Sequence, residues 1–352
     1  MKNFIGCDAH KKYSMFASIN EADHRAQCIK VNNDRHQFSC FLNTLPPNSQ
    51  IAIETVGNWY WMIDEMERAG HEPKLTNAGK AKLMMGQINK TDKLDANGLA
   101  LLLRNGTLPS VWIPPGELRD QRELPRMRMA LVHVRTMLKN RIHAALAKYA
   151  LVITEVSDIF GVSGRKLLKK RLEELPLYTR RSVEAQLKLL DQVKEHIQES
   201  EKQIEEIIER TPEIMLLMTL PGVGPILAIV IALEIGQIDR FFCAEKLASY
   251  AGTVPRIKAS GGKIRYGKTR PDVNRYLKWA LIEAANIAVI NQSRWSDRHV
   301  VRLYRRIRGR RGHGKAVVAV ARHLAEASYW VLKKNEPYKE PKGNKPVSST
   351  RK

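Results

Sequence analysis

The sequence predicts an α/β domain at the N-terminus and a mainly α-helical remainder. In residues 1–110, short apolar runs of strand length alternate with turn residues and with helical patterns. Beyond Glu117 the apolar residues recur at helical spacing, with breaks at proline and glycine. These patterns divide the chain into an α/β domain (1–110), a basic helical and coiled-coil linker (111–210), a C-terminal domain (211–335) and a tail (336–352).

The N-terminal domain begins with three predicted strands in series. A helix that Asp34 can cap follows them and ends at Pro46-Pro47, after which strands and helices alternate. We expect strands over 4–7, 13–19, 26–31, 51–53 and 73–75, and helices over 59–69 and 92–103. Three strands in series followed by alternating helices and strands is the element order of a ribonuclease-H-like fold.

The middle of the chain is predicted to be helical over 117–149 and again over 165–210, apart from Pro176. In the second segment the apolar residues keep a three/four spacing with charges between them, which indicates a coiled-coil hairpin or a dimer seam. An ordinary helix packed on its own domain is the alternative. The residues of this stripe are Val183, Leu187, Leu190, Ile197, Ile204 and Ile208.

The C-terminal domain is expected to begin near Thr211-Pro212 and to consist mainly of helices, among them 241–252 and 273–291. Residues 218–228 are similar to a helix-hairpin-helix turn, because Gly222 and Gly224 permit a tight turn at the start of a helix that can face a phosphate. A purely structural helical hairpin is the alternative. The tail, 336–352, is rich in Lys, Pro and Ser and is predicted to be disordered and basic.

The charge of the chain indicates a polyanionic partner. Lys and Arg number 59 against 36 Asp and Glu, a formal net charge of +23. Such an excess repels itself unless a polyanion neutralises it, and nucleic acid is the most common one. Ribosomal or membrane-surface binding are the alternatives. No apolar run has the length of a membrane span, and no signal peptide is evident. The four cysteines lack metal-ligand spacing and are expected to be reduced. We therefore expect a cytoplasmic protein without a membrane partner.

Four acidic residues follow predicted strands or begin a predicted helix. Asp8 and Glu54 each end a strand, and Asp92 and Asp95 are three apart at a helix start, which places both on one face. Carboxylates that converge from different elements are the ligands that hold Mg²⁺ for phosphodiester cleavage. In the structural alternatives, Asp92 and Asp95 only complement the helix dipole, and Asp8 and Glu54 are turn residues at strand ends. His10, His143 and His313 show no metal-ligand spacing and are not expected to be ligands.

Two basic segments of the C-terminal domain are predicted to contact nucleic acid. In the first, a cationic glycine-rich loop surrounds Ser260, whose hydroxyl can reach a phosphate as a nucleophile. The alternative is a serine that binds phosphate without catalysis. The hydroxyls of Thr253 and Thr269 are rival candidates for the nucleophile. The second is an arginine run broken by Gly309, Gly312 and Gly314 that suits a backbone clamp. The predicted contacts are Arg256, Lys258, Lys263, Arg265, Lys268, Arg270, Arg305, Arg306, Arg308, Arg310 and Arg311.

Three N-terminal stretches resemble the DEDD signature of the IS110 family of insertion-sequence transposases, with its IS1111 subgroup and the related Piv DNA invertases. These are IGCDAHKK (5–12), IAIETVGNWYW (51–61) and NKTDKLDANGLALLL (89–103). The LPGVG turn, SYAGTVPR and ASGGKIRYGK resemble the C-terminal domain of the same family. The resemblance covers roughly residues 1–335. It implies a RuvC-like N-terminal domain, a DNA transposase or recombinase activity, and an Mg²⁺ site formed by Asp8, Glu54, Asp92 and Asp95.

The same resemblance implies that Ser260 is the nucleophile that cuts and rejoins DNA. It also implies donor and target DNA as partners, a structured bridge RNA as guide, homodimers or homotetramers, and a place in the bacterial cytosol or nucleoid. Two alternatives stay open on the residues alone. One is a metal-dependent, structure-specific nuclease like a junction resolvase, in which Ser260 only holds phosphate. The other is a non-catalytic DNA- or RNA-binding protein.

Overall fold

The computed structural model describes residues 3–20, 26–86 and 91–341, and the chain divides into two compact units, Met1–Glu117 and Leu118–Lys352. The helical segment that we predicted as a separate linker over 111–210 therefore lies for the most part in the second unit, together with the C-terminal domain. Each unit has its own hydrophobic core, as the clusters of buried residues show.

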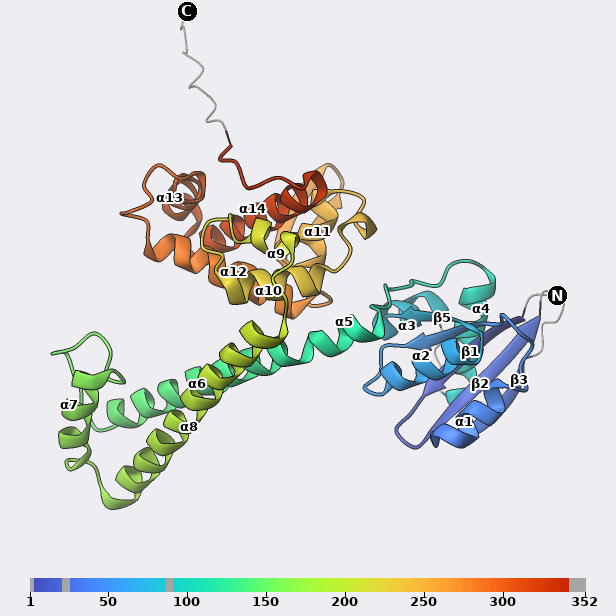
Figure 1. The fold of residues 1–352 in the computed structure, drawn as a ribbon, viewed down its shortest axis with the longest axis horizontal. Helices are drawn as coiled ribbons and strands as arrows, with labels where there is room; N and C mark the ends of the chain where they lie inside the picture. The colour runs from blue at the N-terminus through green and yellow to red at the C-terminus, as the bar shows by residue number, and fades with distance from the viewer. Residues whose placement is uncertain (1–2, 21–25, 87–90, 342–352) are drawn as a thin grey trace, which may run out of the picture. The chain divides into compact units, whose positions relative to one another are not determined.

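The first unit is a five-stranded mixed sheet with helices on both faces (Figure 1). The sheet order is β3-β2-β1-β4-β5; β1, β2 and β3 are antiparallel, while β1, β4 and β5 are parallel. The predicted order of three strands followed by alternating helices and strands is confirmed. The elements are β1 (Asn3–Ala9), β2 (Tyr13–Asn20), β3 (Gln27–Asn32), α1 (Arg35–Leu42), β4 (Gln50–Glu54), α2 (Trp59–Arg68), β5 (Glu72–Thr76), α3 (Ala78–Met85) and α4 (Asp92–Arg104).

The two faces of this sheet are covered by different helices. Ile5 and Cys7 of β1 are buried in a cluster with Phe38 of α1 and Met62 of α2. The opposite face of the sheet packs against α4, whose Leu99 is buried with residues of β1 and β4. Successive strand side chains point to opposite faces, so the residues that alternate with Ile5 and Cys7 lie under α4.

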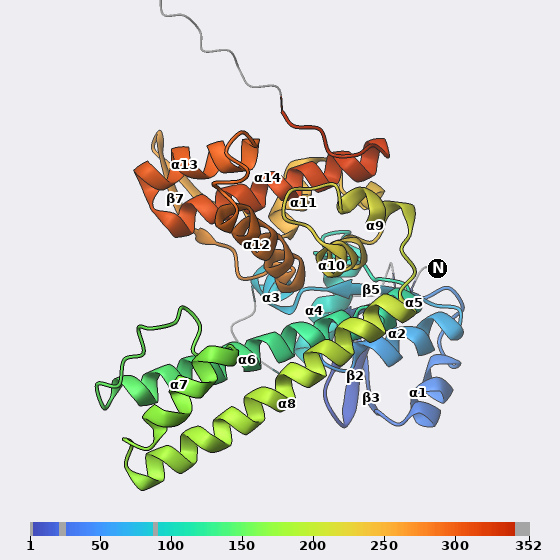
Figure 2. The same ribbon diagram turned by 60° about the vertical axis from the view of Figure 1, so that its left-hand side comes forward.

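The second unit begins with a long helical hairpin, here called the arm. It consists of α6 (Glu123–Ala147), α7 (Val162–Leu172) and α8 (Leu177–Ile207), which follow α5 (Gly116–Gln121). Figures 1 and 2 show α6 and α8 side by side, and the first part of the predicted stripe, including Leu187 and Leu190, is buried in a cluster with Leu138 and Ile142 of α6. The last two residues of the stripe, Ile204 and Ile208, are instead buried in the core of the C-terminal domain. The stripe is therefore covered within this chain, and a coiled-coil or dimer role for it stays a prediction.

The rest of the second unit is a helical domain that carries one β-hairpin. Its elements are α9 (Pro212–Leu217), α10 (Pro225–Ile235), the 3₁₀ turn η1 (Ile238–Arg240), α11 (Ala244–Tyr250), β6 (Pro255–Ser260), β7 (Lys263–Thr269), α12 (Arg275–Ile290), α13 (His299–Arg311) and α14 (His313–Lys334). The turn between α9 and α10 packs on α12, because a Cβ on Gly222 would lie 2.2 Å from the carbonyl oxygen of Ala284. This glycine is thus required for helix packing.

Three local expectations are corrected. The cationic segment around Ser260 is an antiparallel hairpin, β6–β7, because residues of alternating character pair across a two-glycine turn. Gly309 lies inside α13 and Gly314 inside α14, so the arginine run is mostly helical. Residues 336–341 are ordered: Tyr338 contacts His323 and its backbone N–H donates to Thr219. The remaining residues of the predicted tail, 342–352, lie outside the described residues.

Candidate functional site

Asp8 and Glu54 lie at the carboxyl ends of two neighbouring parallel strands. The register of β1 and β4 pairs Cys7 with Ile53, so the two acids occupy adjacent positions one residue further along each strand. Cys7 and Ile53 belong to the cluster under α1 and α2. Because side chains alternate between the faces of a sheet, Asp8 and Glu54 lie on the face that α4 covers.

Helix α4 approaches β1 more closely than side chains normally allow. A Cβ on Gly6 would lie 1.9 Å from the carbonyl oxygen of Ala96 and 2.7 Å from the amide nitrogen of Ala100, so only glycine fits between the strand and the helix. This backbone-to-backbone packing brings the first turn of α4, which carries Asp92 and Asp95, toward the end of β1.

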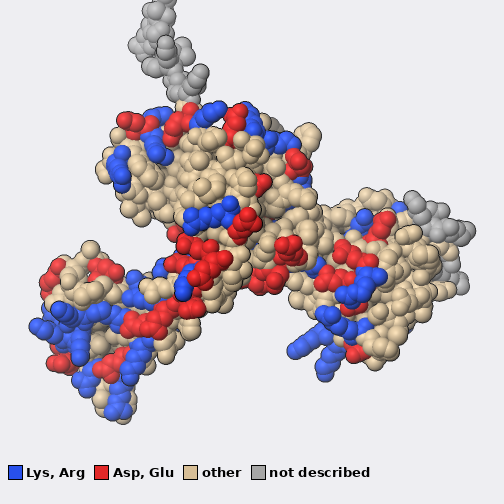
Figure 3. Space-filling view, in the orientation of Figure 1, with Lys and Arg blue, Asp and Glu red and all other residues tan. Residues whose placement is uncertain are grey.

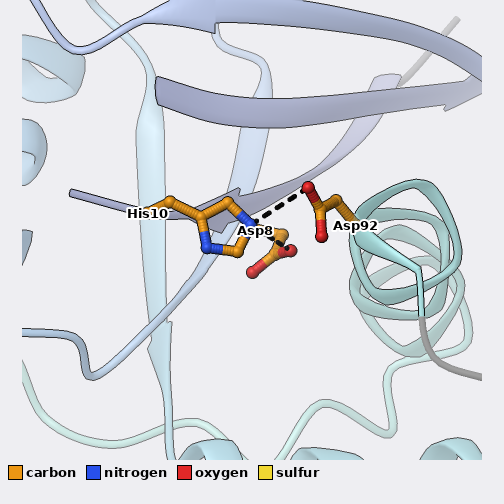
Figure 4. A group of neighbouring side chains, drawn as sticks. All are labelled: Asp8, His10 and Asp92. Carbon is orange, nitrogen blue, oxygen red and sulfur yellow. Dashed lines mark ion pairs between the residues drawn. The ribbon is translucent and has the colours of Figure 1, made fainter. Parts of the chain in front are cut away.

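Asp8, His10 and Asp92 form a compact cluster at this edge of the sheet (Figure 4). The Nε2 atom of His10 lies 3.2 Å from Oδ2 of Asp8 and 3.3 Å from Oδ2 of Asp92. One ligand atom from each of the three side chains lies within 4.8 Å of the others, a spacing that suits a single divalent ion. The expectation that His10 is not a ligand candidate is therefore wrong.

Tyr13, at the start of β2, supports the cluster. Its hydroxyl donates a 2.7 Å hydrogen bond to Oδ2 of Asp92, and its ring lies 4.8 Å from the ring of His10. This hydrogen bond, aided by His10, holds the pKa of Asp92 below its usual value. The amide of Asn58 donates to the backbone carbonyl of His10 at 3.0 Å and fixes the turn after β1.

Glu54 and Asp95 lie on the same face of the sheet but outside the three-residue cluster. Among the described residues, the ligand atoms near enough to share one ion come from Asp8, His10 and Asp92. The structure thus brings together two of the four predicted acids and adds a histidine that the sequence reasoning had set aside. A signal for it was present: Asp8 and His10 are two residues apart, the spacing that places strand side chains on one face.

Ser260 lies at the tip of the β6–β7 hairpin. Gly261 and Gly262 form its two-residue turn with φ of 54° and 72°, the conformation of a type I′ turn. The turn sets Ser260 directly opposite Lys263, and both residues are exposed. Side chains of directly paired residues share a face, so an amine and the serine hydroxyl project to the same side.

The structure separates Ser260 from the two rival hydroxyls. Thr253 is 1% exposed and its hydroxyl donates to the carbonyl of Ala248 at 2.9 Å. The hydroxyl of Thr269 accepts a 2.9 Å hydrogen bond from Nζ of Lys278. Of these three residues, Ser260 is exposed, Thr269 is half-buried and Thr253 is buried.

The cationic residues that we predicted to contact nucleic acid are exposed. Arg270 is paired with Asp272, which raises the pKa of the guanidinium, whereas the others project from the hairpin and from α13. The exposed set on these two elements is Arg256, Lys258, Lys263, Arg265, Lys268, Arg305, Arg306, Arg308, Arg310 and Arg311. A third basic surface, which the sequence reasoning did not single out, lies at the α7 end of the arm, where Figure 3 shows Lys and Arg gathered.

A buried ion-pair network lies at the root of the hairpin. Glu234 at the end of α10 is 2% exposed and receives two hydrogen bonds from Arg126 of α6, at 2.8 and 3.1 Å. Arg122 donates to the neighbouring carbonyl of Leu233 at 2.8 Å. Asn274, which caps α12 shortly after β7, donates to Glu234 at 2.8 Å. The network therefore ties the arm and the hairpin root to the same buried carboxylate.

Comparison with known proteins gives two matching families. A model described as a transposase of the DEDD, IS110 type matches residues 5–151, and a model described as the transposase IS116/IS110/IS902 family matches residues 215–300. Together they span most of the chain and include the acidic cluster and the serine hairpin. In the described part of the chain, no helix combines the length and the apolar character needed to cross a membrane.

Individual relatives agree with these families. The chain is 25% identical to the transposase for insertion sequence element IS1328 of Yersinia enterocolitica (80% of this chain, 83% of the relative). It is 26% identical to the transposase for insertion sequence element IS1111A of Coxiella burnetii (71% and 69%) and 25% identical to the pilin gene-inverting protein of Moraxella bovis (82% and 81%). The chain therefore belongs to the IS110 family of DEDD transposases and is a DNA transposase.

Proposed function

We propose that this transposase cuts and rejoins DNA with Ser260 as the nucleophile and with Mg²⁺ held at the acidic edge of the first unit. The observation that carries the proposal is the position of Ser260. It is exposed at the tip of a hairpin, directly opposite Lys263, on a face that also presents cations. A serine hydroxyl is a weak nucleophile, and cations that clamp the phosphate stabilise the charge that develops during attack.

The chemistry is a transfer of the phosphodiester between hydroxyl groups. The Oγ atom of Ser260 forms a bond to phosphorus, the bond from phosphorus to one ester oxygen of the strand breaks, and that oxygen takes up a proton. The strand is then held as a phosphoserine diester. Attack by a strand hydroxyl on the same phosphorus reverses the step: it forms the new strand joint and returns the proton to Ser260.

The residues at the end of β1 suit a divalent ion. Asp8 and Asp92 would hold it through carboxylate oxygens, and Glu54 and Asp95 on the same face are the further ligands that we propose. A bound Mg²⁺ would supply Lewis-acid stabilisation of the phosphate oxygens. His10 offers a nitrogen ligand at the same place, and imidazole is better suited to a transition metal than to Mg²⁺.

We also propose a structured guide RNA and a homo-oligomer as parts of the active complex. The family resemblance of the sequence motivates both. The net charge of +23 and the exposed cations of α7 and α13 support an RNA partner in addition to DNA, because neither surface includes the serine.

A covalent-trapping assay tests the serine. Purified protein, co-expressed with RNA from the flanking sequence of its element, is mixed with labelled donor and target DNA and Mg²⁺, and the denatured sample is run on a gel. We expect a DNA-shifted protein band in the wild type and in Thr269→Ala, and none in Ser260→Ala. An adduct that persists in Ser260→Ala would overturn the proposal. Asp92→Ala tests whether adduct formation depends on the acidic edge.

One observation favours a second candidate function, a metal-dependent structure-specific nuclease. Asp8, His10 and Asp92 come together within the first unit alone, without any residue of the hairpin. In that case DNA cleavage with Mg²⁺ would persist in Ser260→Ala at the wild-type rate, no adduct would form in either protein, and Asp8→Ala would abolish cleavage.

A further inference from the structure

The β6–β7 hairpin, here called the ribbon (residues 255–269), has two faces of opposite character. Its register pairs Ile257 with Tyr266 and Ala259 with Ile264, and these pairs alternate with Lys258–Arg265 and Ser260–Lys263. Directly paired residues share a face and successive pairs alternate between faces. One face is therefore cationic and carries Ser260, while the other is apolar.

The apolar face is exposed to an extent that is unusual for such side chains. Ile257 is 59%, Ile264 is 61% and Tyr266 is 71% exposed. Each strand of the ribbon has the other strand as its main neighbour among the described elements. A two-stranded hairpin without further packing is marginally stable in water, and exposed clustered apolar side chains mark a contact surface. The ribbon is thus built to be covered by a partner.

The size and charge of the ribbon indicate what kind of partner covers its apolar face. Three large side chains offer far less than the roughly 800 Å² that each partner buries in a stable protein–protein interface. The ribbon holds no Asp or Glu, so it offers nothing to pair with cations of another protein. A two-stranded ribbon is narrow enough to lie against DNA, and apolar side chains that insert between neighbouring base pairs unstack the bases.

We propose that the apolar face of the ribbon packs against DNA bases where the two strands are opened next to the phosphate that Ser260 attacks. The ribbon enters between the strands. Its cationic face, with Lys258, Lys263 and Arg265, lies along the backbone of the attacked strand, and its apolar face covers bases of the opened site. Tyr266 supplies a ring for base stacking, a contact that tolerates any base.

This inference rests on the proposed role of Ser260, and it assigns a task to residues that take no part in the chemistry. Strand exchange leaves bases unpaired, and the flat faces of unstacked bases are surfaces that water solvates poorly. A ribbon that covers them on one face and holds the backbone on the other stabilises the opened DNA in which the strand hydroxyls can change partners.

The test measures base unstacking with 2-aminopurine placed beside the expected cleavage position in the donor DNA. All proteins carry Ser260→Ala, so the measurement does not depend on the covalent step. We expect fluorescence to rise several-fold when this protein binds, and the rise to be lost when Tyr266→Ser and Ile264→Ser are added. The matched control replaces two exposed residues of α8, Tyr178→Ser and Ile207→Ser, which are 84% and 73% exposed, and keeps the rise.

Two further measurements make the outcomes decisive. DNA affinity from fluorescence anisotropy and the thermal unfolding midpoint are expected to stay near those of the parent, because the ribbon packs on little else. An unchanged 2-aminopurine rise in the ribbon variant overturns the inference. So does a change in its sedimentation mass without DNA, which would mean that a second copy of the chain covers the face. If the trapping gel shows that Ser260 is not the nucleophile, the fluorescence still shows whether the ribbon unstacks bases, because all proteins in that test carry Ser260→Ala.

Discussion

The acidic cluster of the first unit and the serine ribbon of the second are held in opposite ways. Asp8 extends from a strand that is buried in the middle of a five-stranded sheet, and Asp92 begins a helix that touches that strand through Gly6. Ser260 instead lies at the tip of a two-stranded ribbon that is exposed on both faces. One site is fixed by the core of its unit, and the other is fixed only at its root.

The difference suits the two tasks that we propose for these sites. Carboxylates that repel one another must be kept close before a cation arrives, and packing in the core supplies the energy for this. In the role that we propose, Ser260 follows a strand from one partner to another and gains nothing from a rigid setting. Substitutions should therefore act through fold stability at the first site, and through local geometry at the ribbon.

The largest effect is expected at the root of the ribbon, where the buried network around Glu234 stabilises the fold of the second unit. Glu234→Ala leaves Arg122 and Arg126 without their buried carboxylate, and we expect a loss of about 3–5 kcal/mol in the free energy of unfolding of the second unit. Urea unfolding measures it. Glu195→Ala on the exposed side of α8 is the control, with an expected change below about 0.5 kcal/mol. A similar small change in both variants would contradict the structural role of the network.

The next effect concerns the packing of α4 on β1. Gly6→Ala places a carbon where the Ala96 carbonyl lies, so helix and strand must separate, at a cost of about 1–3 kcal/mol or more. We expect lower stability of the first unit together with weaker Mn²⁺ binding, because Asp92 moves away from Asp8. Gly57→Ala is the matched control, since a Cβ there meets nothing within 4 Å. Unchanged Mn²⁺ binding in Gly6→Ala would contradict the view that the packing of α4 on β1 fixes the acidic cluster.

A smaller effect is expected at His10. If its imidazole is a ligand, His10→Gln weakens Mn²⁺ binding roughly tenfold and Mg²⁺ binding much less, because Mg²⁺ prefers oxygen ligands. Isothermal titration with each ion measures both affinities. His36→Gln, an exposed histidine of α1, is expected to leave both unchanged. Equal losses for the two ions would exclude a direct nitrogen ligand.

The smallest effect on stability is expected in the ribbon turn. Gly261→Ala forces an alanine to a φ near 54°, which costs about 1–2 kcal/mol locally. Since the ribbon packs on little else, the thermal unfolding midpoint should stay constant while phosphoserine formation falls roughly tenfold. Gly309→Ala, inside α13 with open space around its Cβ, controls for the loss of a glycine. A lowered midpoint in Gly261→Ala would show that the ribbon is part of the core.

The sequence predicted the first unit well because its strands are short apolar runs, most of whose residues are buried, and its turns carry their usual residues. It placed Asp8 and Glu54 at strand ends correctly. It did not reveal the His10 contact with Asp92, because that contact depends on the close approach of α4 at Gly6, which joins residues far apart in the sequence.

The ribbon and the tail were missed for different reasons. The alternation of Arg256, Ile257 and Lys258 and the Gly-Gly pair indicate a type I′ hairpin, but the density of cations favoured a loop. The composition of the tail suggested disorder, yet contacts of Tyr338 with His323 and Thr219 and of Glu340 with the backbone of His299 hold residues 336–341 against the helical domain. The roles of Asp8, Glu54, Asp92 and Asp95 as metal ligands and of Ser260 as the nucleophile stay predictions.

The network around Glu234 has a consequence for how these proteins diverge. The four residues of the network come from three different parts of the second unit: Arg122 and Arg126 from the start of α6, Glu234 from α10, and Asn274 from the start of α12. A change in any one leaves a buried charge or polar group without its partner. We expect these positions to covary among relatives. A chimera that grafts the arm of one relative onto the C-terminal domain of another should fold only when both arginines and their carboxylate are transferred as a set.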